Sequence, residues 1–299
     1  MSQKRIEHTT SRTAEWICMC RAISSLEKDP CYRSADWVAR SLLPDFLRLL
    51  IRIPYVAKLL IKAFSTKGSY EYVIARTKYI DAVFSQALSD RFAQILLFGA
   101  GFDTRALRLQ GKEQKTRIFE LDAPATQQAK INQYQKRHLG IPSNVVFVPI
   151  DFDKESLTMK LDQAGFNRDA RSLFILEGVL MYLLPSSVDQ TFRTIRELAG
   201  AGSEVVFDYV YASVLRHEEK YYGEKGFADA VAKTGEEWRF GIEKGEIKQF
   251  LSKYGLELRD HRDAGELEEM YFKDPSGRIV GRVNGTHCLT RTSWIKGTA

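Results

Sequence analysis

The second part of the sequence repeats one pattern, in which short apolar runs rich in β-branched and aromatic residues alternate with longer stretches of helical periodicity. Strands separated by helices in this way favour right-handed βαβ crossovers and a parallel sheet covered on both faces. We predict five such strands, at 94–98, 117–121, 145–150, 172–176 and 204–207. The clearest of the helices between them are expected at 125–139 and 187–198.

The last third of the chain extends this sheet. A helix near 245–254 precedes two more predicted strands, 256–261 and 285–292, and the acidic segment between those strands is predicted as a loop. The pair is typical of a hairpin-like antiparallel edge. The fold class that we expect is therefore α/β, with a doubly wound, mostly parallel, seven-stranded sheet and an antiparallel edge.

The first 90 residues show helical periodicity only, and their predicted helices are 14–26, 35–43, 46–64 and 70–88. The apolar-rich stretch 46–64 is broken by charges and by Pro54. That spacing suits an amphipathic packed helix and not a membrane span. We therefore predict one domain over 1–299, in which 1–90 form a helical lid or cap and 91–299 form the α/β core.

Composition excludes several classes of function. The 44 Lys+Arg and 38 Asp+Glu give a net charge of +6, but basic and acidic residues are mixed, without a basic tract, so we expect no nucleic-acid partner. Because 46–64 does not suit a membrane span, we expect no membrane partner either. The five histidines are dispersed, which argues against a metal site. The polar start MSQKRIEHTT has no secretory pattern, and we expect a cytoplasmic protein. The four cysteines, which include no CxxC pair, are expected to be reduced: Cys18, Cys20, Cys31 and Cys288.

In an open α/β sheet the ligand lies beyond the carboxyl ends of the strands. After the first strand, Gly99 and Gly101 allow a sharp turn and a close approach of the backbone to a ligand. A dinucleotide motif would place a third glycine at Thr104, and Asp103 puts a negative charge where a pyrophosphate would lie. A cationic sulfonium ligand avoids that repulsion. The alternative is an ordinary turn in which Asp103 caps the next helix.

Carboxylates follow the next strands as well. At the end of the second strand, Asp122 can accept hydrogen bonds from the two hydroxyls of a ribose, or cap the helix that opens at Pro124. Glu120 is predicted to lie on the same face and to support the loop. After the third strand, Asp151 and Phe152 offer an acceptor for an adenine amino group beside an aromatic face, in a sequence that is also common in loops.

Glu177 emerges from the fourth strand, which is predicted to be buried. A buried carboxylate requires a cationic partner, because an unpaired one costs several kcal/mol. The partner is either the ammonium of a bound amino-acid moiety or a structural Arg or Lys.

Four motifs in this order resemble the leucine carboxyl methyltransferase family, which takes in eukaryotic phosphatase carboxyl methyltransferases and a large bacterial group. They are ARTKYIDAV (75–83), LLFGAGFDTRALRL (96–109), FELDAP (119–124) and LFILEGVLMYL (173–183). The resemblance runs from about residue 10 to at least 255. It implies a class I methyltransferase-like fold and the cofactor S-adenosyl-L-methionine.

The resemblance also implies roles for single residues. Gly99 and Gly101 would lie under the methionine part of the cofactor, and Glu177 near its amino-acid end. Arg76 matches a family arginine that pairs with the cofactor carboxylate, and Arg21 matches another basic residue; both could otherwise be exposed helix charges. The full set of cofactor-binding residues that we predict is Arg76, Gly99, Gly101, Asp122, Asp151, Phe152 and Glu177.

The expected activity is methyl transfer to a carboxylate or hydroxyl of a small-molecule acceptor, although a protein carboxyl terminus is an alternative acceptor. A carboxylate needs no general base, whereas a phenol or alcohol would use one. Asp208, Tyr209 and His217 are the bases considered, without a catalytic assignment, and His217 is expected at the surface. The stretch 209–227 either borders the acceptor or is an ordinary amphipathic helix. The alternative functions are a catalytically silent cofactor-binding module and, less favoured, an NAD-dependent oxidoreductase.

Overall fold

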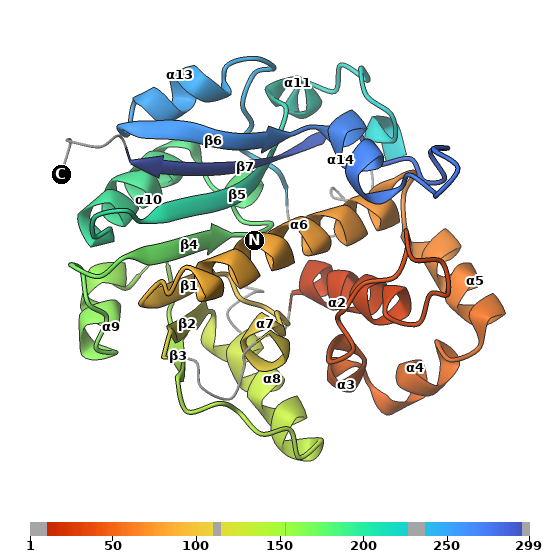
Figure 1. The fold of residues 1–299 in the computed structure, drawn as a ribbon, viewed down its shortest axis with the longest axis horizontal. Coiled ribbons are helices and arrows are strands. Elements are labelled where there is room, and N and C mark those ends of the chain that lie inside the picture. The colour runs from red at the N-terminus through yellow and green to blue at the C-terminus, as the bar shows by residue number, and fades with distance from the viewer. Residues whose placement is uncertain (1–10, 110–114, 153, 227–236, 295–299) are drawn as a thin grey trace.

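A computed structural model describes residues 11–109, 115–152, 154–226 and 237–294. Before the first strand these residues form helices only, as predicted (Figure 1). The prediction of one continuous helix over 46–64 is wrong, because the chain forms two separate helices there. Pro54 occupies the first position of the second helix and lacks the N–H that a continuous helix would need. The helices of this part are α2 (Arg12–Ser24), α3 (Ala39–Leu42), α4 (Asp45–Leu50), α5 (Pro54–Phe64) and α6 (Ser69–Ser89).

The sheet has seven strands in the order β3-β2-β1-β4-β5-β7-β6. Neighbouring strands from β3 to β5 run parallel, and β7 is antiparallel to both β5 and β6. The predicted fold class, with its antiparallel edge, is therefore confirmed. The strands are β1 (Gln94–Phe98), β2 (Arg117–Asp122), β3 (Val145–Pro149), β4 (Ser172–Leu176), β5 (Glu204–Val210), β6 (Leu256–Arg262) and β7 (His287–Trp294).

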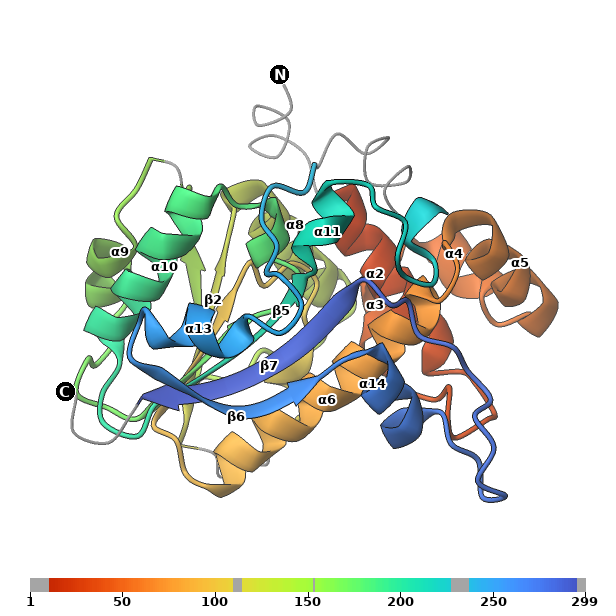
Figure 2. The same cartoon turned by 90° about the horizontal axis from the view of Figure 1, so that it is seen from above.

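Helices cover both faces of this sheet (Figure 2). Alternate residues of β1 point to opposite faces: Ile95 joins a buried apolar cluster that includes α2 and α6, and Leu96 joins one that includes α10 (Pro185–Leu198). Because α2 and β1 share a cluster, the amino-terminal helices pack directly on the α/β core. A single domain over 1–299 stays a prediction. The other helices are α7 (Arg105–Arg108), α8 (Pro124–Lys136), α9 (Leu157–Gln163), η1 (Leu180–Tyr182), α11 (Ala212–Leu215), α13 (Ile247–Ser252) and α14 (Ala264–Tyr271).

The acidic segment between β6 and β7 is not the simple loop that we predicted, because it contains α14. Asp263 accepts a hydrogen bond from the backbone N–H of Glu266, whose side chain in turn accepts one from the backbone N–H of Asp263. This capping box is visible in the sequence as Asp-Ala-Gly-Glu and is the signal that the prediction missed. The four cysteines are unpaired, as expected, and Cys31 is the one that is not fully buried.

Candidate functional site

A pocket of about 800 Å³ lies at the carboxyl ends of β1 to β4. Its wall is built mainly from the loops that follow these four strands, from α2, α6 and α10, and from Glu237 and Arg239 further along the chain. All seven predicted cofactor-binding residues line it: Arg76, Gly99, Gly101, Asp122, Asp151, Phe152 and Glu177. The pocket thus brings together residues that the sequence separates by up to about a hundred positions.

The loop after β1 has the backbone shape that its glycines predict. The φ angles of Gly99 and Gly101 are +58° and +46°, in the left-handed region that other residues rarely adopt. A Cβ on Gly99 would come within 3.1 Å of a methyl group of Val179. These two positions therefore keep the floor of the pocket free of side chains.

Asp122, at the end of β2, lines the pocket beside this glycine loop. Its carboxylate accepts hydrogen bonds from the backbone N–H groups of Gly101 and Ala123, and burial still raises its pKa above the ordinary value. Helix α8 starts after Ala123 without a side-chain cap, so Asp122 is not a helix cap. Glu120 is buried and forms an ion pair with Lys130 of helix α8, with an Oε2–Nζ distance of 2.6 Å; its support of the loop stays a prediction.

The loop after β3 supplies a polar and an aromatic side chain side by side. The carboxylate of Asp151 lies 2.9 Å from the ammonium of Lys154, on the rim of the pocket. The Phe152 ring is 47% exposed and lies nearly parallel to the ring of Phe98, with 6.5 Å between centroids. Such an exposed, pre-oriented ring is suited to stack on a flat heterocycle.

Glu177 has two structural cations as partners. Its carboxylate lies 3.0 Å from Nε of Arg76 and 2.7 Å from Nη1 of Arg105. Arg76 also donates to Asp208, at 2.7 Å. The structural explanation for the charge of Glu177 therefore holds, while both Glu177 and Arg76 still face the pocket.

Arg21 reaches the pocket from α2. Its Nη2 donates to the carbonyl of Phe102 at 2.6 Å, and its Nη1 lies 3.3 Å from a carboxylate oxygen of Asp36. Arg21 and Arg76 are each only 4% exposed, so neither is an exposed helix charge.

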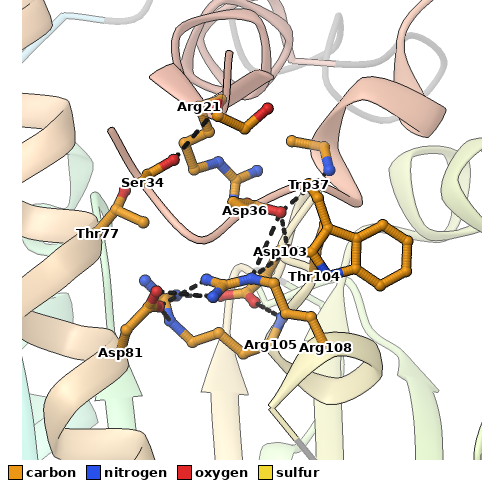
Figure 3. Close-up of polar contacts among 12 residues, drawn as sticks. Arg21, Ser34, Asp36, Trp37, Thr77, Asp81, Asp103, Thr104, Arg105 and Arg108 are labelled. Carbon is orange, nitrogen blue, oxygen red and sulfur yellow. Dashed lines mark hydrogen bonds and ion pairs between the residues drawn. The ribbon is translucent and has the colours of Figure 1, made fainter. Parts of the chain in front are cut away.

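Beneath the pocket lies a buried cluster of charges that the sequence interpretation missed, part of which is shown in Figure 3. Arg105 is fully buried and contacts Asp81, Asp103 and Glu177. Arg108 contacts Asp36 and Asp81. Both arginines lie in the motif GFDTRALRL, but nothing in their spacing reveals partners on α6, before α3 and after β4. The cluster holds four guanidinium groups and five carboxylates: Arg21, Arg76, Arg105, Arg108, Asp36, Asp81, Asp103, Glu177 and Asp208.

The bases that we considered do not reach the pocket. Asp208 is buried and accepts hydrogen bonds from Tyr72, Arg76 and the backbone N–H of Gly178. The Tyr209 hydroxyl is 3.0 Å from a ring nitrogen of His261. His217 is exposed, as expected. None of the described residues of 209–226 lines the pocket, and residue 227 lies outside the described residues.

In the described ranges no group of three or more His, Cys, Asp or Glu is placed to hold a metal ion. Across the same ranges, no helix is both long and apolar enough to cross a membrane.

Comparison with known proteins places the chain in a family. A family model described as leucine carboxyl methyltransferase matches residues 18–196. The candidate S-adenosyl-L-methionine-dependent methyltransferase YktD of Bacillus subtilis is 29% identical over 208 residues, which cover 67% of this chain and 66%, just under two thirds, of YktD. A candidate S-adenosyl-L-methionine-dependent methyltransferase of Mycobacterium marinum is 26% identical over 245 residues, covering 76% of this chain and 75% of that protein.

A solved structure agrees with these sequence matches at the level of the fold. The crystal structure of a candidate methyltransferase from Thermobifida fusca superposes with a TM-score of 0.56, at 15% identity, over 96% of both chains. The family match covers more than half of the chain and contains all four motifs that carry the resemblance. The chain therefore belongs to the leucine carboxyl methyltransferase family.

Proposed function

We propose that this protein transfers the methyl group of S-adenosylmethionine to an oxygen atom of a small-molecule acceptor, with a carboxylate as the favoured acceptor group. Its family and its relatives make it an S-adenosylmethionine-dependent methyltransferase. The proposal adds the residues that hold the cofactor and the chemistry of the acceptor.

The observation that carries the proposal is the convergence of the seven predicted residues on one pocket. Its volume of about 800 Å³ is in the range of small-molecule sites, which is roughly 300–1,000 Å³. Asp122 would accept hydrogen bonds from the ribose, and Asp151 and Phe152 would bind the adenine. Gly99 and Gly101 would leave room for the methionine chain, and Arg76 and Glu177 would face its carboxylate and ammonium.

The charge of the pocket fits a cationic ligand. Seven carboxylates and three guanidinium groups line it, and the described lining contains neither Lys nor His. The members of the buried cluster that do not line the pocket add three carboxylates and two guanidinium groups. An excess of negative charge in a partly desolvated site attracts a sulfonium and repels a phosphate. This argues against a dinucleotide in the same place.

The acceptor follows from what the lining offers. Asp208, Tyr209 and His217 do not line the pocket, so none of these three can take a proton from an acceptor hydroxyl there. An acceptor carboxylate needs no base, but within this negatively charged lining it requires a cationic partner. Arg239 lines the pocket and forms no ion pair with a carboxylate in the described part of the chain. Its backbone N–H donates to the carbonyl of Met181 at 2.7 Å, which fixes it beside the loop after β4. We assign Arg239 to the acceptor carboxylate.

Catalysis would then consist largely of positioning. The bound cofactor supplies an electrophilic methyl group, and the chain holds the acceptor oxygen in line with it and excludes water. Proximity and orientation of this kind are worth up to about 7–11 kcal/mol.

The test has two stages. Calorimetric titration with S-adenosylmethionine, S-adenosylhomocysteine and NAD should show micromolar binding of the two sulfur ligands and none of NAD; binding of NAD alone would refute the proposal. Transfer of tritium from methyl-labelled cofactor is then measured for a panel of carboxylic acids and a matched panel of phenols. We expect carboxylic acids to react, and Arg239→Gln to raise their KM at least tenfold while Arg239→Lys restores it. Cofactor binding without transfer to either panel would support the silent module instead.

A further inference from the structure

Exposed apolar side chains are concentrated on α4, α5 and the residues beside them. Of the fourteen large apolar side chains that are exposed in the described chain, eight fall between positions 37 and 64. Tyr55 is 77% exposed and Phe64 is 66% exposed. Single exposed apolar residues are normal, but the concentration of eight in one short segment of the chain points to a site of interaction. The eight are Trp37, Phe46, Leu49, Leu50, Ile53, Tyr55, Leu59 and Phe64.

The outer side of α5 combines apolar and basic residues. Tyr55, Lys58, Leu59 and Lys62 are all exposed and follow the i, i+3, i+4, i+7 spacing that places them on one side of a helix. Ala57 is the one fully buried residue of α5, and α4 has none. Figures 1 and 2 show both helices projecting at the edge of the molecule, far from the sheet. We call residues 46–64 the α4–α5 face.

This part of the chain also carries most of its net charge. Residues 37–68 contain six of the 44 basic residues and one of the 38 acidic residues, so this segment holds five of the six net positive charges. The one acid, Asp45, is already paired with Lys136 and Arg137 of the neighbouring helix α8 and the residue that follows it. The expectation that basic residues are evenly mixed with acids is therefore wrong for this segment.

We propose that the α4–α5 face docks on the surface of a lipid bilayer that contains anionic lipids. Amphipathic helices bind such surfaces through exposed aromatic and aliphatic side chains, which enter the bilayer interface, and through nearby Lys and Arg, which pair with anionic headgroups. Docking requires no membrane-spanning segment, so the reasoning that led us to expect no membrane partner does not apply to it. This inference does not rest on the proposed function.

Two other occupants fit the observations less well. A second copy of the chain would bring two faces of the same strong positive charge together, and like charges repel. A nucleic acid would pair with the cations but leave the apolar tips in water. A bilayer with anionic headgroups satisfies both the charge and the apolar surface.

The face is connected to the pocket by packing. Helix α2, which lines the pocket with Ala14, Ile17 and Arg21, also packs against α3 and α5. A bilayer bound at the α4–α5 face would therefore contact the same helical layer that borders the pocket.

The experiment is sedimentation of the full chain with vesicles of phosphatidylcholine alone or with 30% phosphatidylglycerol. We expect the affinity for the anionic vesicles to exceed that for the neutral ones at least tenfold, since each basic residue near such a surface raises the affinity about fivefold. The affinity for the anionic vesicles should also fall at least tenfold between 0.1 and 0.5 M NaCl. The double variant Tyr55→Ser/Leu59→Ser should bind at least tenfold more weakly. The double variant Met270→Ser/Ile279→Ser, which alters exposed apolar residues elsewhere, should bind like the wild type.

Thermal unfolding shows whether the variants fold; all four positions are exposed, so their melting temperatures should match the wild type. The proposal is overturned if anionic and neutral vesicles bind equally, or if both double variants bind like the wild type. It is also overturned if the chain does not bind vesicles and sedimentation velocity shows a dimer that Tyr55→Ser/Leu59→Ser dissociates but Met270→Ser/Ile279→Ser does not. That last result would make the face an interface between copies.

Discussion

Replacement of Arg105 by Met tests whether the buried charge cluster holds the site together. Arg105 is fully buried, with Nε 2.8 Å from Asp81 and Nη1 2.7 Å from Glu177. In the variant, Asp81 still forms an ion pair with Arg108, and Glu177 still forms one with Arg76. Asp103, in contrast, loses its ion pair with Arg105. A buried charge left unpaired in this way costs about 3–5 kcal/mol.

This cost can be converted into a melting temperature. An unfolding entropy of about 2.1 cal/mol/K per residue gives about 0.6 kcal/mol/K for 299 residues, so Arg105→Met should lower Tm by about 5–8 °C. The control is Arg216→Met, because Arg216 is half exposed and pairs with Glu218 and Glu243 at the surface. Solvent screens such surface pairs, so the control should change Tm much less than Arg105→Met does.

The pH dependence gives an independent check. Burial alone would raise the pKa of Asp103, but the guanidinium of Arg105 lowers it to about 2. A carboxylate whose pKa is lower in the folded chain contributes stability above its unfolded pKa of about 3.9, and that stability is lost as the pH falls toward 2. Without Arg105, burial raises the pKa, Asp103 takes up a proton more readily, and the penalty of the variant should shrink between pH 7 and pH 4. Urea unfolding at several pH values measures this. A Tm shift no larger than that of Arg216→Met, or a penalty that grows on acidification, would refute the reasoning.

Three further predictions concern the pocket and its surroundings. Asp122→Asn should weaken calorimetric binding of S-adenosylhomocysteine about ten- to a hundredfold, since charge-assisted hydrogen bonds contribute about 1.5–3 kcal/mol, whereas the exposed Asp162→Asn should leave it unchanged. Phe152→Ala should weaken the same binding about two- to twelvefold through lost stacking, with Tm almost unchanged because the ring is half exposed. Burial lowers the pKa of His287 well below its ordinary value, and the nearby charge of Arg76 lowers it further. Because the unfolded chain then binds a proton more readily than the folded one, the wild type should lose stability in urea unfolding as the pH falls from 7 to 5. His287→Asn should flatten that dependence, and an equally steep curve for the variant would contradict the assignment.

The sequence predicts those parts of the fold whose signal is local. Strands β1 and β4 match their predicted bounds to the residue, because each is a run of five buried residues closed by glycine or polar residues. β5 extends three residues beyond its predicted end, to Val210, and includes Asp208. A carboxylate in mid-strand is unfavourable on propensity alone. It is stable here because Tyr72 and Arg76, more than 130 positions earlier, donate hydrogen bonds to it.

For the site as well, the sequence predicts what depends on local patterns and not the contacts between distant residues. Each predicted pocket residue follows a predicted strand or lies in a recognised motif, and the topology of a parallel sheet brings such positions together. The pairing of Arg105 with Asp81 and Glu177 has no counterpart in any local pattern, since the three residues belong to α7, α6 and the end of β4. Arg239 is held at the pocket by contacts with residues far away in the sequence, such as the backbone hydrogen bond to Met181, and no local pattern predicts them.

The order of the strands has a consequence for how the chain is made. β7 lies between β5 and β6, although the ribosome produces it after both. While residues 287–294 are still in the exit tunnel, β5 presents one unpaired edge and β6 has no strand partner at all. Open edges of this kind are templates for pairing with other chains. The sheet is therefore complete only once its seventh strand has been inserted between two strands made earlier, and a chain that stops before residue 287 lacks an interior strand of the sheet.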